Sequence, residues 1–253
     1  MLRGLYLSAT GMITQELRQK VISNNLANAN TNGFKSEKAT VSSFSEMLLN
    51  RLEKGENTPI GYFSPGVMVD RVHTNFSSGN LEETGCSTDL ALTETKGGLP
   101  VFFSVQAGNS ELYTRDGEFQ VDANGFLVTS EGYPVQGQYG PIFVGTKDFE
   151  VDDVGQVIVN DQVVDQLRIV TFSDPNLLKR QGNNFFLAPQ EMQPEMGVDY
   201  KVKQGWLEKG NVDITREFID MLSVLRSYEV NQRVLQAQDQ TLAKSVNEIG
   251  SLR

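Results

Sequence analysis

The sequence predicts an α+β protein with a long helix at each end and a central, mostly antiparallel β domain in the form of a small barrel or sandwich. The last forty or so residues carry an apolar repeat with spacings of three and four, and the first thirty read as an amphipathic helix. Between them, apolar and polar residues alternate over short runs that end in turn dipeptides, as strands do. Coiled-coil-like helices at both ends can pair with each other or with those of neighbouring copies. This arrangement favours a building block over an enzyme.

The first helix is predicted over residues 2–29. Several asparagines crowd its end, and Gly33 is a suitable left-handed cap. A frayed helix end explains them, because the Asn side chain competes for backbone hydrogen bonds. Alternatively, some of these amides lie in a helix–helix contact and fix its register. The asparagines are Asn24, Asn25, Asn28, Asn30 and Asn32.

Residues 39–80 are expected to form a helix and an extended connector. Met47, Leu48 and Leu52 favour a short helix near residues 44–52. Residues 55–66 contain repeated glycines and prolines, so they are predicted to form a loop or an extended segment.

From about residue 67 onward the pattern is that of strands, and residues 81–203 are assigned to the central β domain. Asn124-Gly125 predicts the turn of one hairpin, and Asn160-Asp161 that of another. Residues 119–128 resemble residues 149–158, which predicts two hairpins of the same design in one sheet system.

The last helix is predicted to begin after Gly210, with Asn211 or Asp213 as its cap. Gln232 and Asp239 lie within its 3–4 repeat, and two polar residues there argue against a simple dimeric zipper. Residues 204–253 thus form a second terminal assembly segment beside residues 1–38. The repeat consists of Phe218, Met221, Leu225, Tyr228, Gln232, Leu235, Asp239, Leu242, Val246 and Ile249.

The net charge of −10 is spread unevenly along the chain. Residues 1–38 carry five basic and two acidic side chains, the last fifty carry six and seven, and the middle carries eleven and twenty-three. The acidic middle argues against nucleic acid as a partner, since binding it needs a basic face. A membrane-spanning helix needs about 18 consecutive apolar residues, and no run in the sequence approaches this length. No secretory signal is recognisable. We therefore expect no membrane insertion, and either a cytoplasmic protein or export by a route that reads no such signal.

No catalytic, cofactor or metal site is predicted. The single Cys86 excludes an internal disulfide, and nothing places it beside His73, the only histidine. The Asp122-to-Gly125 run resembles a calcium loop but lacks a carboxylate at the twelfth position, so a hairpin turn is favoured. A hydrolase using acidic residues is not supported, because no carboxylate pair is marked out for acid–base roles. Trp206 is expected to be a packing anchor before the last helix.

Three separated sequence motifs resemble those of the bacterial flagellar rod and hook protein family. The first consists of LYLSATGM at residues 5–12 and ISNNLANANTNGFK at residues 22–35. The second consists of YTRDGEF at residues 113–119 and NGFLVT at residues 124–129. The third consists of QGWLEKGNVD at residues 204–213 and RSYEVN at residues 226–231. The resemblance covers nearly the whole chain, although the segment from Thr93 to Pro100 departs from the family's tighter turn.

The resemblance implies a structural subunit of the basal-body rod that polymerises helically into a drive shaft and is exported without a cleaved signal. The implied partners are further copies, other flagellar rod and hook proteins, and the flagellar export apparatus. The chain length favours a rod subunit over a hook subunit, and we favour the distal rod type over the similar proximal type. The alternatives are a hook-type axial protein, or a soluble β binding module oligomerised by its terminal helices.

The predicted assembly interface lies on the two terminal helices, which we expect to become ordered only when neighbouring copies bury them. Its residues are Leu2, Leu5, Ala9, Met12, Leu17, Asn24, Asn25, Asn28, Phe218, Leu225, Tyr228, Leu235, Leu242 and Ile249.

Overall fold

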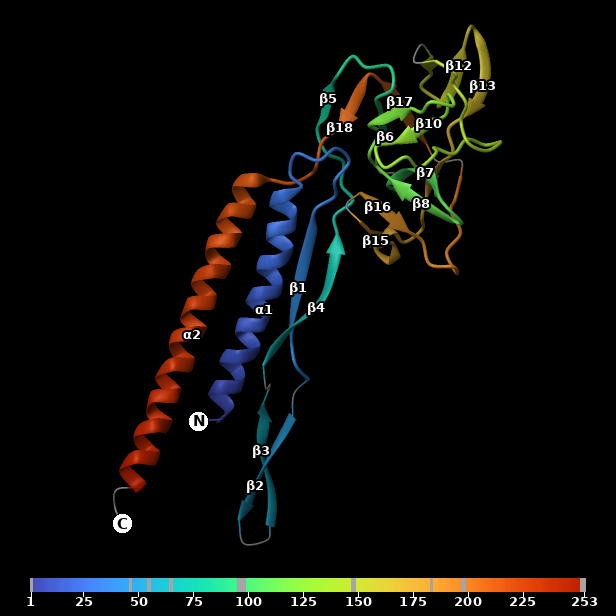
Figure 1. Ribbon diagram of the computed structural model, residues 1–253. Coiled ribbons are helices and arrows are strands. Elements are labelled where there is room, and N and C mark those ends of the chain that lie inside the picture. Colours follow the sequence, from blue (N-terminus) through green and yellow to red (C-terminus); the bar gives the residue numbers. More distant parts are fainter. Residues whose placement is uncertain are drawn as a thin grey trace. The chain divides into compact units, whose positions relative to one another are not determined.

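The chain folds into two compact units in the computed structural model, which is drawn in Figure 1. The helical unit contains Met1–Leu26, Glu37–His73 and Asp213–Arg253, and the β unit contains Ala27–Ser36 and Thr74–Val212. The chain therefore passes between the units four times. The structure describes residues 2–45, 47–53, 56–63, 66–94, 99–146, 149–182, 184–196 and 199–250.

Two long helices, α1 (Leu2–Ala27) and α2 (Ile214–Gly250), dominate the helical unit. The start of α2 is fixed by Asp213, whose carboxylate accepts a hydrogen bond from the backbone N–H of Arg216 at 3.1 Å. Of the two candidate caps, Asp213 is therefore the one used. The side chain of Asn211 instead forms hydrogen bonds within the β unit.

The helical unit also contains four strands. β1 (Glu37–Ser43) pairs with β4 (Val67–Thr74), and β2 (Met47–Glu53) pairs antiparallel with β3 (Glu56–Phe63). A register shift between Leu49 and Asn50 interrupts the second pair.

The prediction of a helix near residues 44–52 is therefore wrong, because β2 occupies most of that segment. A short apolar run fits a helix or a strand equally well, and here the neighbouring segment decides. β3 lies where a loop or extended segment was predicted, and it supplies β2 with a partner for its backbone groups. The extended alternative for residues 55–66 is thus the correct one over β3.

The β unit is built from antiparallel pairs, as predicted. Its largest sheet has five strands in the order β14-β7-β8-β16-β15, and β11-β12-β13 form a second sheet. Smaller two-stranded sheets pair β9 with β10, β6 with β17 and β5 with β18. The bounds are β5 Leu81–Glu83, β6 Leu90–Glu94, β7 Val101–Ala107, β8 Ser110–Thr114, β9 Phe119–Val121, β10 Leu127–Thr129, β11 Glu150–Val151, β12 Gln156–Val159, β13 Gln162–Gln166, β14 Ile169–Thr171, β15 Lys179–Gln181, β16 Phe185–Leu187, β17 Tyr200–Gln204 and β18 Trp206–Glu208, with a 3₁₀ helix at Pro175–Leu177.

The two predicted hairpins of the same design are confirmed, but they belong to two separate sheets and not to one. Asp122 accepts hydrogen bonds through its carboxylate from the backbone N–H groups two and four residues later, at 2.9 and 2.8 Å. Asp152 does the same at 3.0 and 2.7 Å. Gly125 and Gly155 then occupy the left-handed region, at φ of +89° and +83°. Asp122 is therefore occupied in a turn, as the hairpin interpretation expected.

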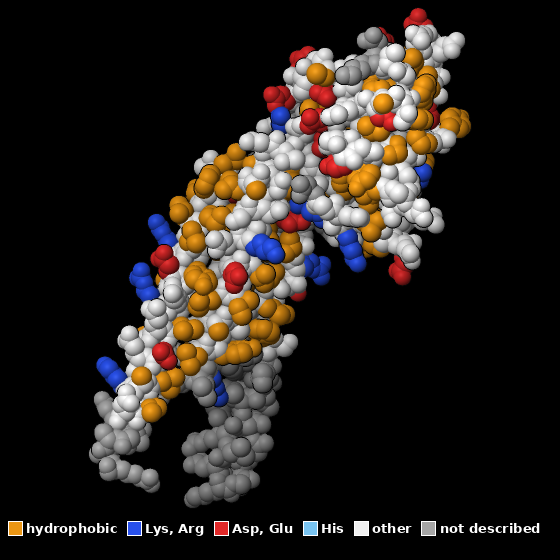
Figure 2. Space-filling model, in the orientation of Figure 1, with side chains coloured by type: hydrophobic (Ala, Val, Ile, Leu, Met, Phe, Trp, Pro, Cys, Tyr) orange, Lys and Arg blue, Asp and Glu red, His pale blue; other side chains and the backbone are white. Residues whose placement is uncertain are grey.

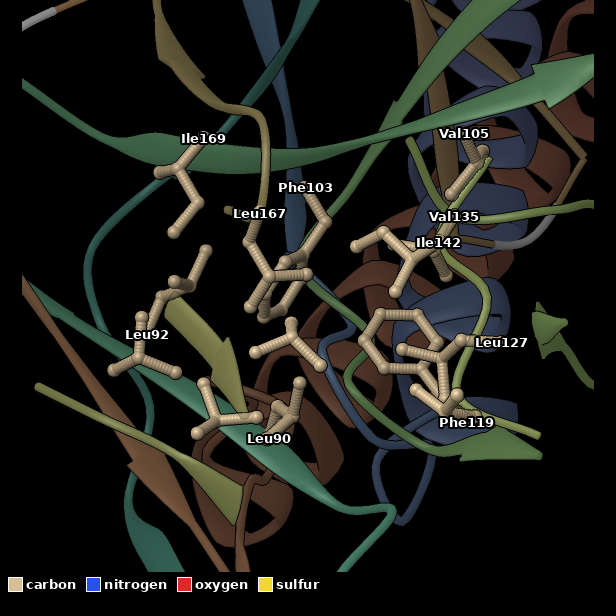
Figure 3. Close-up of a cluster of buried hydrophobic side chains, with 14 of the residues drawn as sticks. Leu90, Leu92, Phe103, Val105, Phe119, Leu127, Val135, Ile142, Leu167 and Ile169 are labelled. Atoms are coloured by element: carbon tan, nitrogen blue, oxygen red, sulfur yellow. The ribbon is translucent and has the colours of Figure 1, made fainter. Parts of the chain in front are cut away.

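The hydrophobic core of the β unit has two parts on the two faces of β7. Val101, Phe103 and Val105 point into the larger cluster, which Figure 3 shows, and Phe102 points into the smaller one. This alternation follows from the two-residue period of a strand. Residues 101–105 of β7 are therefore buried on both faces of the strand. Within the parts of the chain that the structure describes, no helix is long and apolar enough to cross a membrane.

Candidate assembly surface

Large apolar side chains are exposed along both helices of the helical unit (Figure 2). On α2, Phe218, Ile219 and Leu222 are 52%, 61% and 55% exposed. Burying one such side chain fully contributes about 1.5–3 kcal/mol, so a series of them is a substantial unused source of binding energy. The other exposed ones are Tyr6, Leu7, Ile13 and Leu17 on α1 and Ile214, Leu225, Val230, Val234 and Val246 on α2.

The less exposed face of α2 carries a different set of residues. Its positions alternate in steps of four and three, and three of the eight are polar or charged. They are Glu217, Met221, Val224, Tyr228, Asn231, Leu235, Gln238 and Leu242.

The apolar repeat predicted for α2 is thus divided between two faces. Met221, Tyr228, Leu235 and Leu242 belong to the less exposed face. Every second residue of the predicted repeat is exposed. The inner face of α2 is instead completed by a second row of residues, which consists of Glu217, Val224, Asn231 and Gln238. The exposed members of the repeat are Phe218, Leu225, Gln232, Asp239 and Val246.

The residues predicted to form the assembly interface lie at different depths. Leu17, Asn24, Phe218 and Leu225 are exposed, Asn25 is buried, and Asn28 is half-buried in the β unit. The half-buried residues of the helical unit are Leu5, Ala9, Met12, Tyr228, Leu235 and Leu242. The side chains of Leu2 and Ile249 lie outside the described part of the chain.

Asn25 connects three elements of the helical unit. Its amide donates to the backbone oxygen of Glu37 in β1 at 2.8 Å and to the carboxylate of Glu217 in α2 at 3.1 Å. Its side-chain oxygen accepts from the backbone N–H of Glu37 at 2.9 Å. Asn25 is 1% exposed, and its hydrogen bond to Glu217 places it in a contact between α1 and α2, as predicted for some of the asparagines in this segment.

A cluster of four charged side chains lies inside the β unit. The carboxylate of Glu208 accepts hydrogen bonds from Lys35 Nζ and from Arg115 Nε, both at 2.8 Å. Arg115 also donates to Glu94 at 2.7 Å, and its side chain is 0% exposed. The two cations and two anions balance, as buried charges require.

Electrostatics within this charge cluster are strongly perturbed. Burial lowers the pKa of Lys35 to about 8, with a further lowering from Arg115 and an opposing effect of Glu208. Burial alone would raise the pKa of Glu208, but the charges of Arg115 and Lys35 hold this pKa below its usual range. The ionised cluster is therefore stabilised only as a complete set.

The charge cluster joins the three sequence motifs. Lys35 comes from the first motif, Arg115 from the second and Glu208 from the third. Backbone contacts reinforce this convergence, because Gly33 N donates to Glu208 O at 2.7 Å. A side chain at Gly33, whose φ is +67°, would overlap the backbone of the second motif.

The second motif also holds a carboxyl with a raised pKa. Burial raises the pKa of Asp116 to about 6, although hydrogen bonds from the Glu118 backbone and the Asn184 amide oppose this shift. The Asn184 amide donates to Asp116 at 3.0 Å and to Asn32 O at 2.9 Å. This network holds the first motif against the second.

Sequence reasoning did not identify Lys35, Glu94 or Glu208 as a cluster. The carboxylate partners of Arg115, Glu94 and Glu208, are 21 and 93 residues away in the sequence. The sequence feature that could have pointed to the charge cluster is a charged residue beside apolar neighbours within each motif. Whether these charged residues lie close together depends on how the strands pair. The short motifs do not encode that pairing by themselves.

Comparisons with known proteins match three family models along the chain. The model described as flagella basal body rod protein matches residues 5–35, and the flagellar hook protein FlgE/F/G D1 domain matches residues 100–160. The flagellar basal body rod FlgEFG protein C-terminal model matches residues 203–249.

Similar proteins extend over the full length of the chain. It is 34% identical over 271 aligned positions to the flagellar hook-basal body complex protein FlhO of Bacillus subtilis, covering 100% of both chains. It is 32% identical to the flagellar basal-body rod protein FlgG of Buchnera aphidicola, covering 96% of this chain and 98% of the relative. It is 29% identical to the flagellar basal-body rod protein FlgF of Caulobacter vibrioides, covering 98% of each.

Proposed function

The chain belongs to the bacterial flagellar basal-body rod protein family and is a structural rod subunit of the flagellar basal body, and we propose that its copies polymerise helically into the drive shaft. In this proposal the shaft transmits torque to the hook and conducts exported subunits. Its other partners are neighbouring rod and hook proteins and the export apparatus. No catalytic activity is proposed.

The exposed apolar residues of α1 and α2 carry the proposal. Phe218, Leu222 and Leu225 follow one another at spacings of four and three, so they form a stripe on one side of α2. Copies that bury this stripe against a different face of the next copy make heterologous contacts, which extend into a helical filament when they do not close into a ring. We propose that α1 and α2 gain coiled-coil character in this filament.

Export as an unfolded chain is compatible with two properties of the protein. Cys86, the only cysteine, cannot form an internal disulfide that would obstruct threading. The long helices leave apolar side chains exposed, so much of their stabilisation is available only after docking. We propose that ordering on assembly prevents early polymerisation, and that the subunit occupies the distal part of the rod.

The test of the proposal places charges on the stripe. Phe218→Glu and Leu222→Glu together should abolish polymerisation, measured by sedimentation and electron microscopy, and should block rod completion in cells. Ser223→Glu with Thr241→Glu, at exposed positions of α2 away from the stripe, is the matched control and should polymerise like the parent. Normal polymers from the stripe variant would refute the proposed assembly surface.

A deletion provides a second arm. Removing residues 224–253 should leave the β unit folded by circular dichroism and should eliminate assembly. The competing function, a soluble β binding module with oligomerising helices, predicts a closed dimer or trimer of the parent in sedimentation. A hook-type axial protein would instead be incorporated beyond the rod.

A further inference from the structure

Two glycines of α1 lie against two amide side chains of α2. A Cβ atom at Gly4 would overlap the amide of Gln238, and a Cβ atom at Gly11 would lie 2.9 Å from Asn231 Nδ2. The two glycines are seven residues apart, and so are the two amides. Glycine thus leaves room at these points for the amide side chains of α2 to lie directly against the backbone of α1, and a larger residue would require the amides to move.

A third contact continues the same spacing. Asn25 is fourteen residues after Gly11, and its partner Glu217 is fourteen residues before Asn231. Numbers rise on α1 as they fall on α2, so the two helices run antiparallel. The intermediate position of α2, Val224, is 1% exposed and continues the row. Contacts thus recur at heptad intervals, which keep one face of each helix toward the other.

This glycine–amide ladder, made by Gly4, Gly11 and Asn25 on α1 and Gln238, Asn231 and Glu217 on α2, is polar, whereas the apolar side chains of Phe218, Leu222 and Leu225 on α2 point outward. The side-chain oxygen of Gln238 is buried without a hydrogen-bond partner among the described residues. A buried, unpaired amide oxygen opposes pairing. The glycine–amide ladder therefore contributes little hydrophobic attraction between the two helices. Its role must instead follow from the geometry of its contacts.

We propose that the glycine–amide ladder selects the antiparallel register in which α1 pairs with the α2 of its own chain. Displacement by one heptad would place Gly4 opposite Asn231 and Gly11 opposite Val224, and it would leave the buried amide of Asn25 without Glu217. Other displacements bring larger α1 side chains against the amides. The ladder thus fixes the pairing within one subunit and leaves the outward stripe for neighbours, a division that rests on the proposed function.

Cysteine cross-linking tests the register directly, in full-length protein carrying Cys86→Ser. Gly11→Cys with Asn231→Cys should form an intramolecular disulfide several-fold faster than the heptad-offset pairs Gly11→Cys with Gln238→Cys and Gly4→Cys with Asn231→Cys. Non-reducing gels separate intramolecular from intermolecular products. Equal rates for the offset pairs, or intermolecular products alone, would overturn the proposal.

A rescue experiment tests the ladder at a second position. With Gly4→Cys and Gln238→Cys as the reporter pair, Gly11→Ala should slow disulfide formation several-fold, and adding Asn231→Ala should restore it. Alanine is a better helix former than glycine, so a slower reaction reports the helix contact and not lost helicity. Ser23→Ala, at an exposed position of α1, is the control. No effect of Gly11→Ala would contradict the ladder.

Running the cross-linking on unpolymerised subunits separates the two proposals. Closure of the in-register pair in protein that never polymerises supports the ladder and refutes the proposed assembly. Polymers in which only offset pairs close refute the ladder alone.

Discussion

Glu208 is a single residue on which several interactions of the β unit depend. It accepts hydrogen bonds from Lys35, Arg115 and the backbone N–H of Gly79, and its side chain is 1% exposed. Glu208→Ala leaves two buried cations without their shared partner, so we expect a loss of about 3–5 kcal/mol in the free energy of unfolding. Urea denaturation followed by the fluorescence of Trp206, the only tryptophan, measures it.

The matched control for Glu208→Ala is Glu191→Ala. Glu191 is exposed, so its replacement should change the free energy of unfolding by less than about 0.5 kcal/mol. A small effect at both positions would show that the charge cluster does not hold the β unit together.

Asp116 should make the stability of the β unit depend on pH. Its pKa is raised to about 6 in the folded protein. The protonated carboxyl contributes stability that is fully present below the ordinary pKa, near 4, and is lost as the pH rises through about 6. Asp116→Asn cannot ionise, so its free energy of unfolding should rise relative to the parent by roughly 1–3 kcal/mol between about pH 4 and pH 7. Urea unfolding at several pH values measures the difference, and a constant difference over this range would contradict the shift.

At the scale of an element, the turn of the β12–β13 hairpin tests how local chemistry fixes a fold. Asn160 and Asp161 both have positive φ, 51° and 61°, as a two-residue type I′ turn requires. Glycine adopts this conformation without steric cost, so Asp161→Gly should raise the free energy of unfolding by about 0.5 kcal/mol. Gln162→Gly, one residue later inside β13, should lower it. Thermal denaturation of both variants measures the two effects, and a loss of stability in Asp161→Gly would contradict this account of the turn.

Such turns, and the start of α2, could be predicted from the sequence because the deciding residues are neighbours in the chain. The 47–53 segment could not, because its apolar residues suit either a helix or a strand and β3 decides between them. The inner row of α2 was also missed. Two adjacent rows both have 3–4 spacing, and which of them faces inward depends on how α1 and α2 pack, which the sequence of α2 alone does not determine.

At the scale of the whole molecule, all of the net charge belongs to one unit. The helical unit has twelve basic and twelve acidic residues, and the β unit has ten and twenty. Copies brought together by their helices bring these acidic units near one another, so their repulsion opposes the proposed polymerisation. Raising the salt concentration from about 0.1 M to about 1 M shortens the screening length from about 10 Å to about 3 Å and should lower the concentration needed for polymers.

Sedimentation at several salt concentrations measures this effect. Replacing exposed acidic residues, Glu150→Gln with Glu191→Gln, should reduce the dependence on salt. Polymers that dissolve as salt is added would show instead that ion pairs hold the copies together.

The four passages of the chain between its two units bear on how the molecule withstands twisting. A single covalent tether lets two bodies swivel, because rotation about its single bonds absorbs the turn. Four tethers wind around one another when either body turns, and each is shortened in the process. A rotating load applied to one unit therefore meets an elastic restoring force in every connection at once, without requiring any of them to be rigid.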